Sequence, residues 1–179
     1  MIPRVASVIL MLAVLAGLAT GCQPQPEPTP TASVFASEEE AFAAAEETYR
    51  AYVDALNQVD LSDPETFEAV YAWTTGELNA TDRKNFSAWH ADGYSKSGEA
   101  RITETRAGAV HRLGSPDVTV RMEACYDVSA VDVVDKEGKS VVSPERPSLQ
   151  RLALVFVTAD TPTSLGIDAI SPAEGDLNC

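Results

Sequence analysis

Two histidines and two strand-borne acids are the side chains of this sequence best suited to acid–base chemistry. His90 follows a tryptophan and His111 stands beside an arginine, and neither has a carboxylate or nucleophile at the spacing of a catalytic pair. Glu123 and Asp127 lie in a stretch that alternates like a β-strand, so either could point into an apolar interior that would raise its pKa. We expect no catalytic residue, and an acid–base enzyme would have to use Glu123 or Asp127.

Acidic residues also gather between Asp127 and Glu137, where oxygen ligands for a calcium ion could meet. The segment lacks the alternating ligands and central glycine of an EF-hand loop. The sequence contains no CxxC pair and no glycine-rich phosphate loop. We therefore expect neither a metal ion nor a cofactor, and we interpret these acids as turn and strand-surface residues.

The first of the three cysteines, Cys22, is a candidate for covalent modification of its thiol. It closes an apolar run over residues 5–18 and directly follows the small residues Ala19, Thr20 and Gly21. A short basic start, an apolar core and small residues before a cysteine are typical of an export signal. The motif resembles the lipobox of bacterial lipoproteins. This resemblance implies cleavage before Cys22, acylation of its thiol with fatty acids such as palmitate, and a lipid anchor at the outer face of the cell membrane.

The other interpretation of residues 5–21 is a membrane-spanning helix. The run is about 17 residues, at the lower limit for crossing about 30 Å of hydrocarbon, and no basic cluster follows it. Instead, proline alternates through residues 23–31, which favours an extended spacer. We assign residues 1–21 to a signal peptide, 22–36 to the lipidated cysteine and its proline-rich linker, and 37–179 to one folded domain.

If Cys22 is acylated, Cys125 and Cys179 remain as a pair. Two thiols in an exported chain favour one disulfide. The bridge would tie the last residue of the sequence to the middle of the domain and prevent the C-terminal end from fraying.

The charge of the chain restricts its partners. Thirteen Lys and Arg stand against 27 Asp and Glu, for a formal net charge of −14. Such a surface repels nucleic acid and anionic headgroups, so we expect no nucleic-acid partner and membrane contact through the lipid anchor alone.

The pattern of apolar residues changes period near Gly98. Before it, a capping box at Ser37 and Glu40, an Asp63-Pro64 helix start and 3.6-residue periodicity predict three helices. After it, strand-like alternation predicts an antiparallel meander. Helices followed by a meander indicate an α+β fold in which N-terminal helices pack on a curved antiparallel sheet. The expected helices cover 38–58, 63–75 and 77–91, and the expected strands cover 101–105, 118–122, 126–134, 149–157 and 165–170.

The order of elements resembles the NTF2-like (cystatin-like cone) superfamily, in particular small NTF2-like lipoproteins of Gram-positive bacteria. The segments that carry the resemblance are 41–56, 93–98, 123–129, 133–139 and the terminal cysteine. It implies a cone of curved sheet whose mouth can hold a ligand. The superfamily includes both enzymes and binding domains, so the fold does not decide the activity.

Five aromatic residues could line the mouth of such a cone as an apolar pocket, or could belong to the ordinary core: Tyr52, Phe67, Trp73, Trp89 and Tyr94. The sequence favours a lipid-anchored, non-catalytic domain that binds a protein or a small apolar ligand. The alternative is an isomerase- or cyclase-type enzyme with an acid–base residue inside the cone.

Overall fold

The computed structural model describes residues 33–174 and 177–179. The predicted signal peptide, Cys22 and most of the proline-rich linker therefore lie outside the described residues. In the described residues, four helical segments precede six strands. The helical segments are α1 (Glu38–Asn57), η1 (Pro64–Phe67), α2 (Glu68–Tyr71) and α3 (Gly76–Asp92), and the strands are β1 (Ser95–Ser97), β2 (Arg101–His111), β3 (Thr119–Asp127), β4 (Asp132–Val134), β5 (Leu149–Thr158) and β6 (Leu165–Pro172).

Helix α1 begins at a reciprocal capping box. The Ser37 hydroxyl accepts a hydrogen bond from the Glu40 amide at 3.1 Å, and the Glu40 carboxylate accepts one from the Ala36 amide at 2.7 Å. Three glutamates in the first turn also favour the positive end of the helix dipole. The face of α1 that carries Tyr49 and Tyr52 is buried, so this helix contributes two tyrosine rings to the core beneath the sheet.

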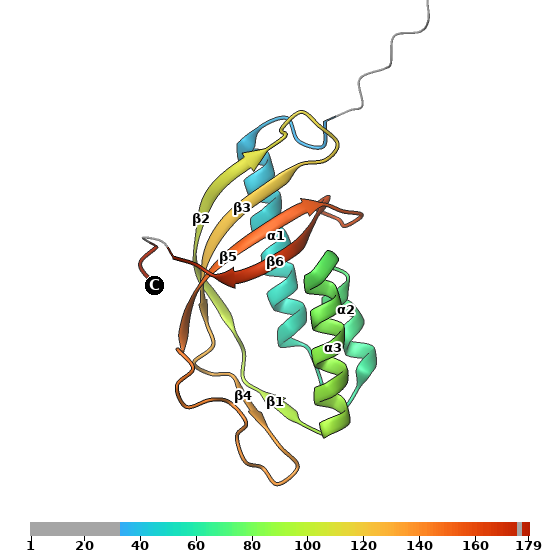
Figure 1. Cartoon of the computed structure of the whole chain (residues 1–179), viewed down its shortest axis with the longest axis vertical. Helices are drawn as coiled ribbons and strands as arrows, with labels where there is room; N and C mark the ends of the chain where they lie inside the picture. The colour runs from blue at the N-terminus through green and yellow to red at the C-terminus, as the bar shows by residue number, and fades with distance from the viewer. Residues whose placement is uncertain (1–32, 175–176) are drawn as a thin grey trace, which may run out of the picture. The chain divides into compact units, whose positions relative to one another are not determined.

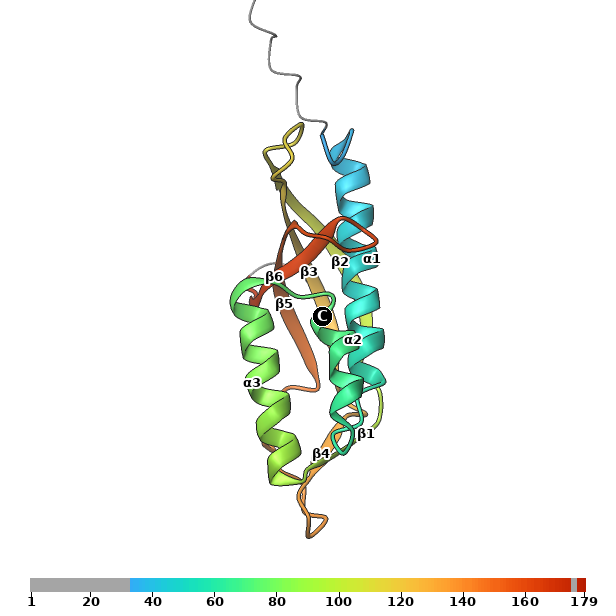
Figure 2. The same ribbon diagram turned by 90° about the vertical axis from the view of Figure 1, so that its right-hand side faces the viewer.

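Four strands form an antiparallel sheet in the order β2-β3-β5-β6, and β1 pairs with β4 in a separate two-stranded ribbon. The helices cover one face of the curved sheet (Figures 1 and 2). Along β3, Val120, Met122 and Ala124 are buried on that face, whereas Arg121 and Glu123 alternate onto the other face. Pairing of β2 with β3 shifts register twice, and such bulges bend a strand.

The predicted fold class is confirmed: the domain is α+β, with N-terminal helices packed on a curved antiparallel sheet. The sheet is not closed into a barrel, which leaves its concave side accessible beyond the helices. Among the described residues, no helix is both long and apolar enough to cross a bilayer.

Two local expectations differ from the structure. The expected strand over 126–134 is divided because the Asp127 carboxylate accepts a hydrogen bond from the Ser129 amide at 2.8 Å, which turns the chain after β3. The segment after Asp63 forms a 3-10 turn followed by one short helix instead of a continuous helix. The turn after β3 makes β4 a separate strand, which pairs with β1 near the end of α3 (Figure 1).

Candidate functional site

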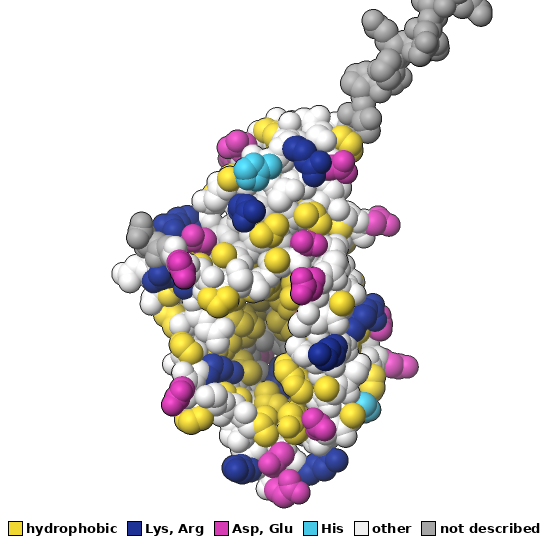
Figure 3. Space-filling model, viewed as in Figure 1, with side chains coloured by type: hydrophobic (Ala, Val, Ile, Leu, Met, Phe, Trp, Pro, Cys, Tyr) yellow, Lys and Arg dark blue, Asp and Glu magenta, His cyan; other side chains and the backbone are white. Residues whose placement is uncertain are grey.

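A hollow lined by aromatic and aliphatic side chains lies between α1, α3 and the concave face of the sheet. Hydrophobic side chains gather around a hollow on this face of the molecule (Figure 3). The cavity has a volume of about 250 Å³. We call it the tyrosine hollow, and its lining residues are Tyr49, Tyr52, Leu56, Leu78, Tyr126, Gln150, Leu152 and Ile170.

Residues of strands β3, β5 and β6 and of helices α1 and α3 line the tyrosine hollow. They face it together because side chains alternate along a strand and repeat every three to four residues along a helix. Tyr126 on β3 pairs in register with Gln150 on β5, so both side chains point from the same face of the sheet. Tyr49 and Tyr52 stand three residues apart on α1 and face the sheet together, with ring centroids 6.5 Å apart. The Tyr49 ring is also 6.4 Å from that of Tyr126. The hollow is therefore walled by aromatic rings from a helix and a strand.

Asp82 on α3 is the carboxylate nearest to this aromatic wall. The Tyr52 hydroxyl donates to Asp82 Oδ2 at 3.3 Å, and Leu78, one helical turn before Asp82, lines the hollow. Burial raises the pKa of Asp82 to about 6, against a smaller lowering by the Tyr52 hydrogen bond. Within the described part of the chain, none of the ion pairs includes Asp82.

The tyrosine hydroxyls of the hollow stay protonated at physiological pH. Burial raises the pKa of Tyr49 and of Tyr52, and it raises that of Tyr126 to about 12 in spite of the nearby Arg146 charge. A protonated phenol can donate a hydrogen bond as well as accept one. The hollow thus offers apolar surface and neutral hydroxyl groups. The Asp82 carboxylate is not among its lining residues but contacts one of these hydroxyls, that of Tyr52.

A second groove lies between the end of α3 and the segment that follows β4. Its volume is about 410 Å³, and its lining residues are Trp89, Tyr94, Val133, Val141, Val142, Ser143 and Arg146. Trp89 is 37% exposed and Val141 is 42% exposed. The Arg146 guanidinium donates to the carbonyls of Val128 and Val131 at 3.1 and 2.7 Å, which holds it at the base of this groove.

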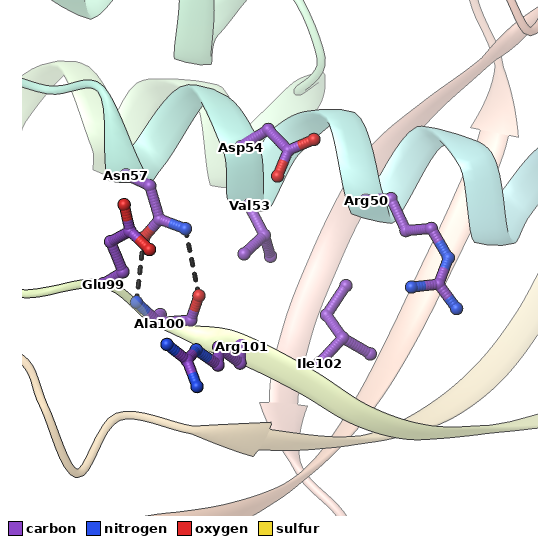
Figure 4. A pocket seen from close by; sticks show the side chains of 8 residues that line it. All are labelled: Arg50, Val53, Asp54, Asn57, Glu99, Ala100, Arg101 and Ile102. Atoms are coloured by element: carbon purple, nitrogen blue, oxygen red, sulfur yellow. Dashed lines mark hydrogen bonds between the residues drawn. The ribbon is translucent and has the colours of Figure 1, made fainter.

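A third depression, between α1 and the start of β2, is polar (Figure 4). Its centre is Asn57, whose amide group donates to the Ala100 carbonyl and accepts from the Ala100 amide, each at 2.9 Å. Arg50, on the same rim, pairs with Glu46 at 2.6 Å along the helix surface. Asp54 on this rim is exposed. The Asn57 pair ties α1 to the sheet, and the charged groups around it face solvent.

The five aromatic residues singled out in the sequence do not line one cavity. Tyr52 lines the tyrosine hollow, and Trp89 and Tyr94 share the second groove. Phe67 is buried against Phe86, with ring centroids 5.2 Å apart. Trp73 is partly buried and packs against the core, so these last two act as packing residues.

The residues considered for acid–base chemistry lie elsewhere. Glu123 pairs with Arg106 on the face of the sheet away from the helices, and Asp127 caps a turn. Hydrogen bonds from Ser129 lower the pKa of Asp127. His90 Nδ1 lies 2.8 Å from the Leu61 carbonyl, and His111 is exposed at the end of β2. None of the four lines the tyrosine hollow.

Sequence reasoning missed Asp82, although a signal for it exists. The apolar stripe of α3 runs through Leu78, Phe86 and Trp89, and Asp82 occupies the missing position of that stripe. A carboxylate on the apolar face of an amphipathic helix must lie partly out of water. That position alone would have marked Asp82 for attention.

The remaining site expectations concern the cysteines and metal ions. A disulfide joins Cys125 on β3 to Cys179, with 5.4 Å between the Cα atoms, which is the pairing expected from the sequence. In residues 33–174 and 177–179, no group of three or more His, Cys, Asp or Glu side chains is arranged to hold a metal ion.

Comparison with known proteins gives likenesses of fold. No protein-family model and no curated protein matches the chain. The intermembrane-space region of the chloroplast protein ARC6 is similar with a TM-score of 0.50 and 10% identity, covering 73% of this chain and 94% of that one. A periplasmic fragment of TraM has a TM-score of 0.46 and 11% identity (78% and 100% covered), and Agrobacterium tumefaciens VirB8 has 0.35 and 10% (79% and 96%). At such identities, likeness concerns the fold alone.

Proposed function

We propose that this chain is a lipid-anchored, extracytoplasmic domain that binds a small apolar ligand in the tyrosine hollow and catalyses no reaction. The open hollow is the observation that carries the binding role: rings of Tyr49, Tyr52 and Tyr126 leave a cavity of about 250 Å³ that their own packing does not fill. Cavities with apolar walls and a few polar groups are the usual form of small-ligand sites.

The place of the domain rests on the sequence motif that ends at Cys22. An acylated Cys22 would anchor the chain, and the proline-rich segment would hold the domain away from the bilayer. Mass spectrometry of the native N-terminus should find a lipidated cysteine, and Cys22→Ala should move the chain out of the membrane fraction. An unmodified N-terminus upstream of Cys22 would contradict the anchor.

The binding role is tested with an uncharged apolar dye, N-phenyl-1-naphthylamine. Its fluorescence should rise on addition of the chain and fall back in Gln150→Trp, because an indole at this position fills the hollow. Leu149→Trp is the matched control: neighbouring residues of a strand point to opposite faces, so the same bulk is added outside the hollow. Equal dye binding by both variants would place the dye elsewhere. If the wild type does not bind the dye, the hollow is not a ligand site. The remaining binding mode is then contact of another protein with the Trp89 groove.

An acid–base enzyme is the second candidate, favoured by one observation. Asp82 has a pKa near 6 and a tyrosine hydroxyl 3.3 Å away, which is the pairing of a general base with a hydrogen-bond donor. Turnover of a small carbonyl compound that is abolished by Asp82→Asn, with dye binding retained, would favour this reading over simple binding.

A further inference from the structure

Among residues 33–174 and 177–179, no ion pair includes Asp82, although its side chain lies partly out of water. It contacts the Tyr52 hydroxyl at 3.3 Å. The adjacent cation, Arg83, lies on another side of α3, where its guanidinium sits 4.0 Å above the Tyr71 ring and pairs with Glu68. A half-buried carboxylate without a cation is costly in an apolar setting, and a bound cation would remove that cost.

The walls of the tyrosine hollow favour the same kind of ligand. Aromatic ring faces attract ammonium groups, and three tyrosine rings line the hollow. The charge of Arg146 acts on Tyr126, and the Val128 and Val131 carbonyls hold its guanidinium. Arg146 therefore lies on the Tyr126 side of the hollow and Asp82 on the Tyr52 side, so a positive group is favoured beside Tyr52 and Asp82.

We propose that the ligand of the tyrosine hollow carries an ammonium group on a small apolar body, with Asp82 as its counterion and Tyr52 as a positioning residue. This inference rests on the proposed binding function and specifies its ligand class. The apolar body contacts Leu78, Leu152 and Ile170, and the ammonium reaches the carboxylate beside Tyr52.

The test compares three probes of similar shape and different charge by calorimetry at pH 7.5: cyclohexylammonium, cyclohexanol and cyclohexanecarboxylate. The wild-type chain should bind the ammonium about tenfold or more tightly than the alcohol, as expected for a hydrogen bond to a charged partner. It should bind the carboxylate more weakly than either.

Two variants with the same change of charge separate Asp82 from general acidity. Asp82→Asn should lower the affinity for cyclohexylammonium about tenfold and leave that for cyclohexanol within about twofold. Asp54→Asn removes one acid from the polar depression of Figure 4 and should change neither affinity. Equal losses in both variants would overturn the inference.

The outcomes also separate this inference from the proposed function. If cyclohexanol and the apolar dye bind but the ammonium shows no advantage, the hollow binds apolar ligands and the counterion role of Asp82 is refuted. If neither the dye nor any of the three probes binds, both proposals fail.

Discussion

The two faces of the central sheet are stabilised in different ways. On the face towards the helices, β3 and β5 contribute Val120, Met122, Leu154 and Phe156, all almost fully buried. On the other face, β3 carries the charged side chains of Arg121 and Glu123 and the bridge from Cys125 to Cys179, and the outward-facing Val155 and Val157 of β5 are only partly buried. The helix-side face has a continuous hydrophobic core, whereas the outer face has a covalent tie and surface charge pairs.

This difference explains where a cavity can persist. The helix-side face buries a large apolar area, and this burial stabilises the fold. A cavity of about 250 Å³ can therefore stay unfilled on this face without unfolding the domain. A face that is covered by only a few residues needs a covalent bond to keep them in place. The comparison predicts that changes on the outer face alter stability but not ligand binding.

The largest expected effect is loss of the disulfide. Replacing Cys125 and Cys179 with alanine should lower the free energy of unfolding by about 2–4 kcal/mol, chiefly because the unfolded chain is no longer constrained. Urea denaturation measures the loss, and the wild type under reducing conditions is the control. Dye affinity of the folded variant should remain within about twofold of wild type. A variant that unfolds as the wild type does would show that the outer face needs no covalent tie.

The next effect concerns the polar joint between α1 and β2. Asn57→Ala should cost about 2 kcal/mol, because the Ala100 amide and carbonyl lose their partners at a half-buried position. Asn57→Asp keeps the acceptor but places a carboxylate oxygen against the Ala100 carbonyl, and two acceptors repel each other, so its cost should be at least that of alanine. Chemical denaturation of the three proteins checks the order. An alanine variant as stable as the wild type would mean that hydrophobic packing alone holds α1 on the sheet.

A smaller, pH-dependent effect should come from Asp82. Its pKa rises from 3.8 in the unfolded chain to about 6 in the folded one, so the folded state holds the proton over this range. Stability therefore falls as the pH rises from about 4 to about 6, by about 1–2 kcal/mol once solvent screening of a partly exposed group is allowed for.

Asp82→Asn should remove this dependence, so the variant gains stability over wild type at pH 7.5 and not at pH 4. Thermal melts at both pH values measure the difference between the two proteins. Taking the difference cancels the opposite contribution of Glu46, Asp60 and Asp127, whose pKa values are lowered. A constant difference across the pH range would refute the assignment.

The smallest effect should come from the ion pair of Glu123 with Arg106 on the outer face. Both side chains are partly exposed, and such pairs contribute at most about 1 kcal/mol. Glu123→Gln should change the melting temperature slightly, less so at high salt, and leave dye binding unchanged. Loss of dye binding in this variant would refute the prediction that changes on the outer face leave ligand binding unchanged.

Local sequence signals were sufficient for most of the fold. The Ser37 cap and the periodicity behind it predicted α1 to within one residue at its end, and the alternation after residue 149 predicted β5. The three-residue strand β1 was not predicted, because a strand of that length has no detectable period and exists only through its pairing with β4.

The candidate site was harder to predict because it depends on contacts distant in sequence. Tyr52 and Asp82 are 30 residues apart, and only the packing of α1 against α3 brings them together. Trp89 continues the apolar stripe of α3, but it stands where the helix ends beside the groove, so it is half-exposed instead of core. The sequence specified which faces are apolar, and not which of them would remain uncovered.

The bridge between Cys125 and Cys179, which are separated by 54 in the sequence, also makes a covalent ring of this part of the chain. The exposed Lys139 lies within this ring, in the turn after β4. A protease that cuts there produces two pieces that remain joined through sulfur and through the pairing of β3 with β5. The cut molecule therefore has the mass of the intact chain plus one water molecule until its disulfide is reduced. The domain can persist after a cut that would separate a chain without the bridge.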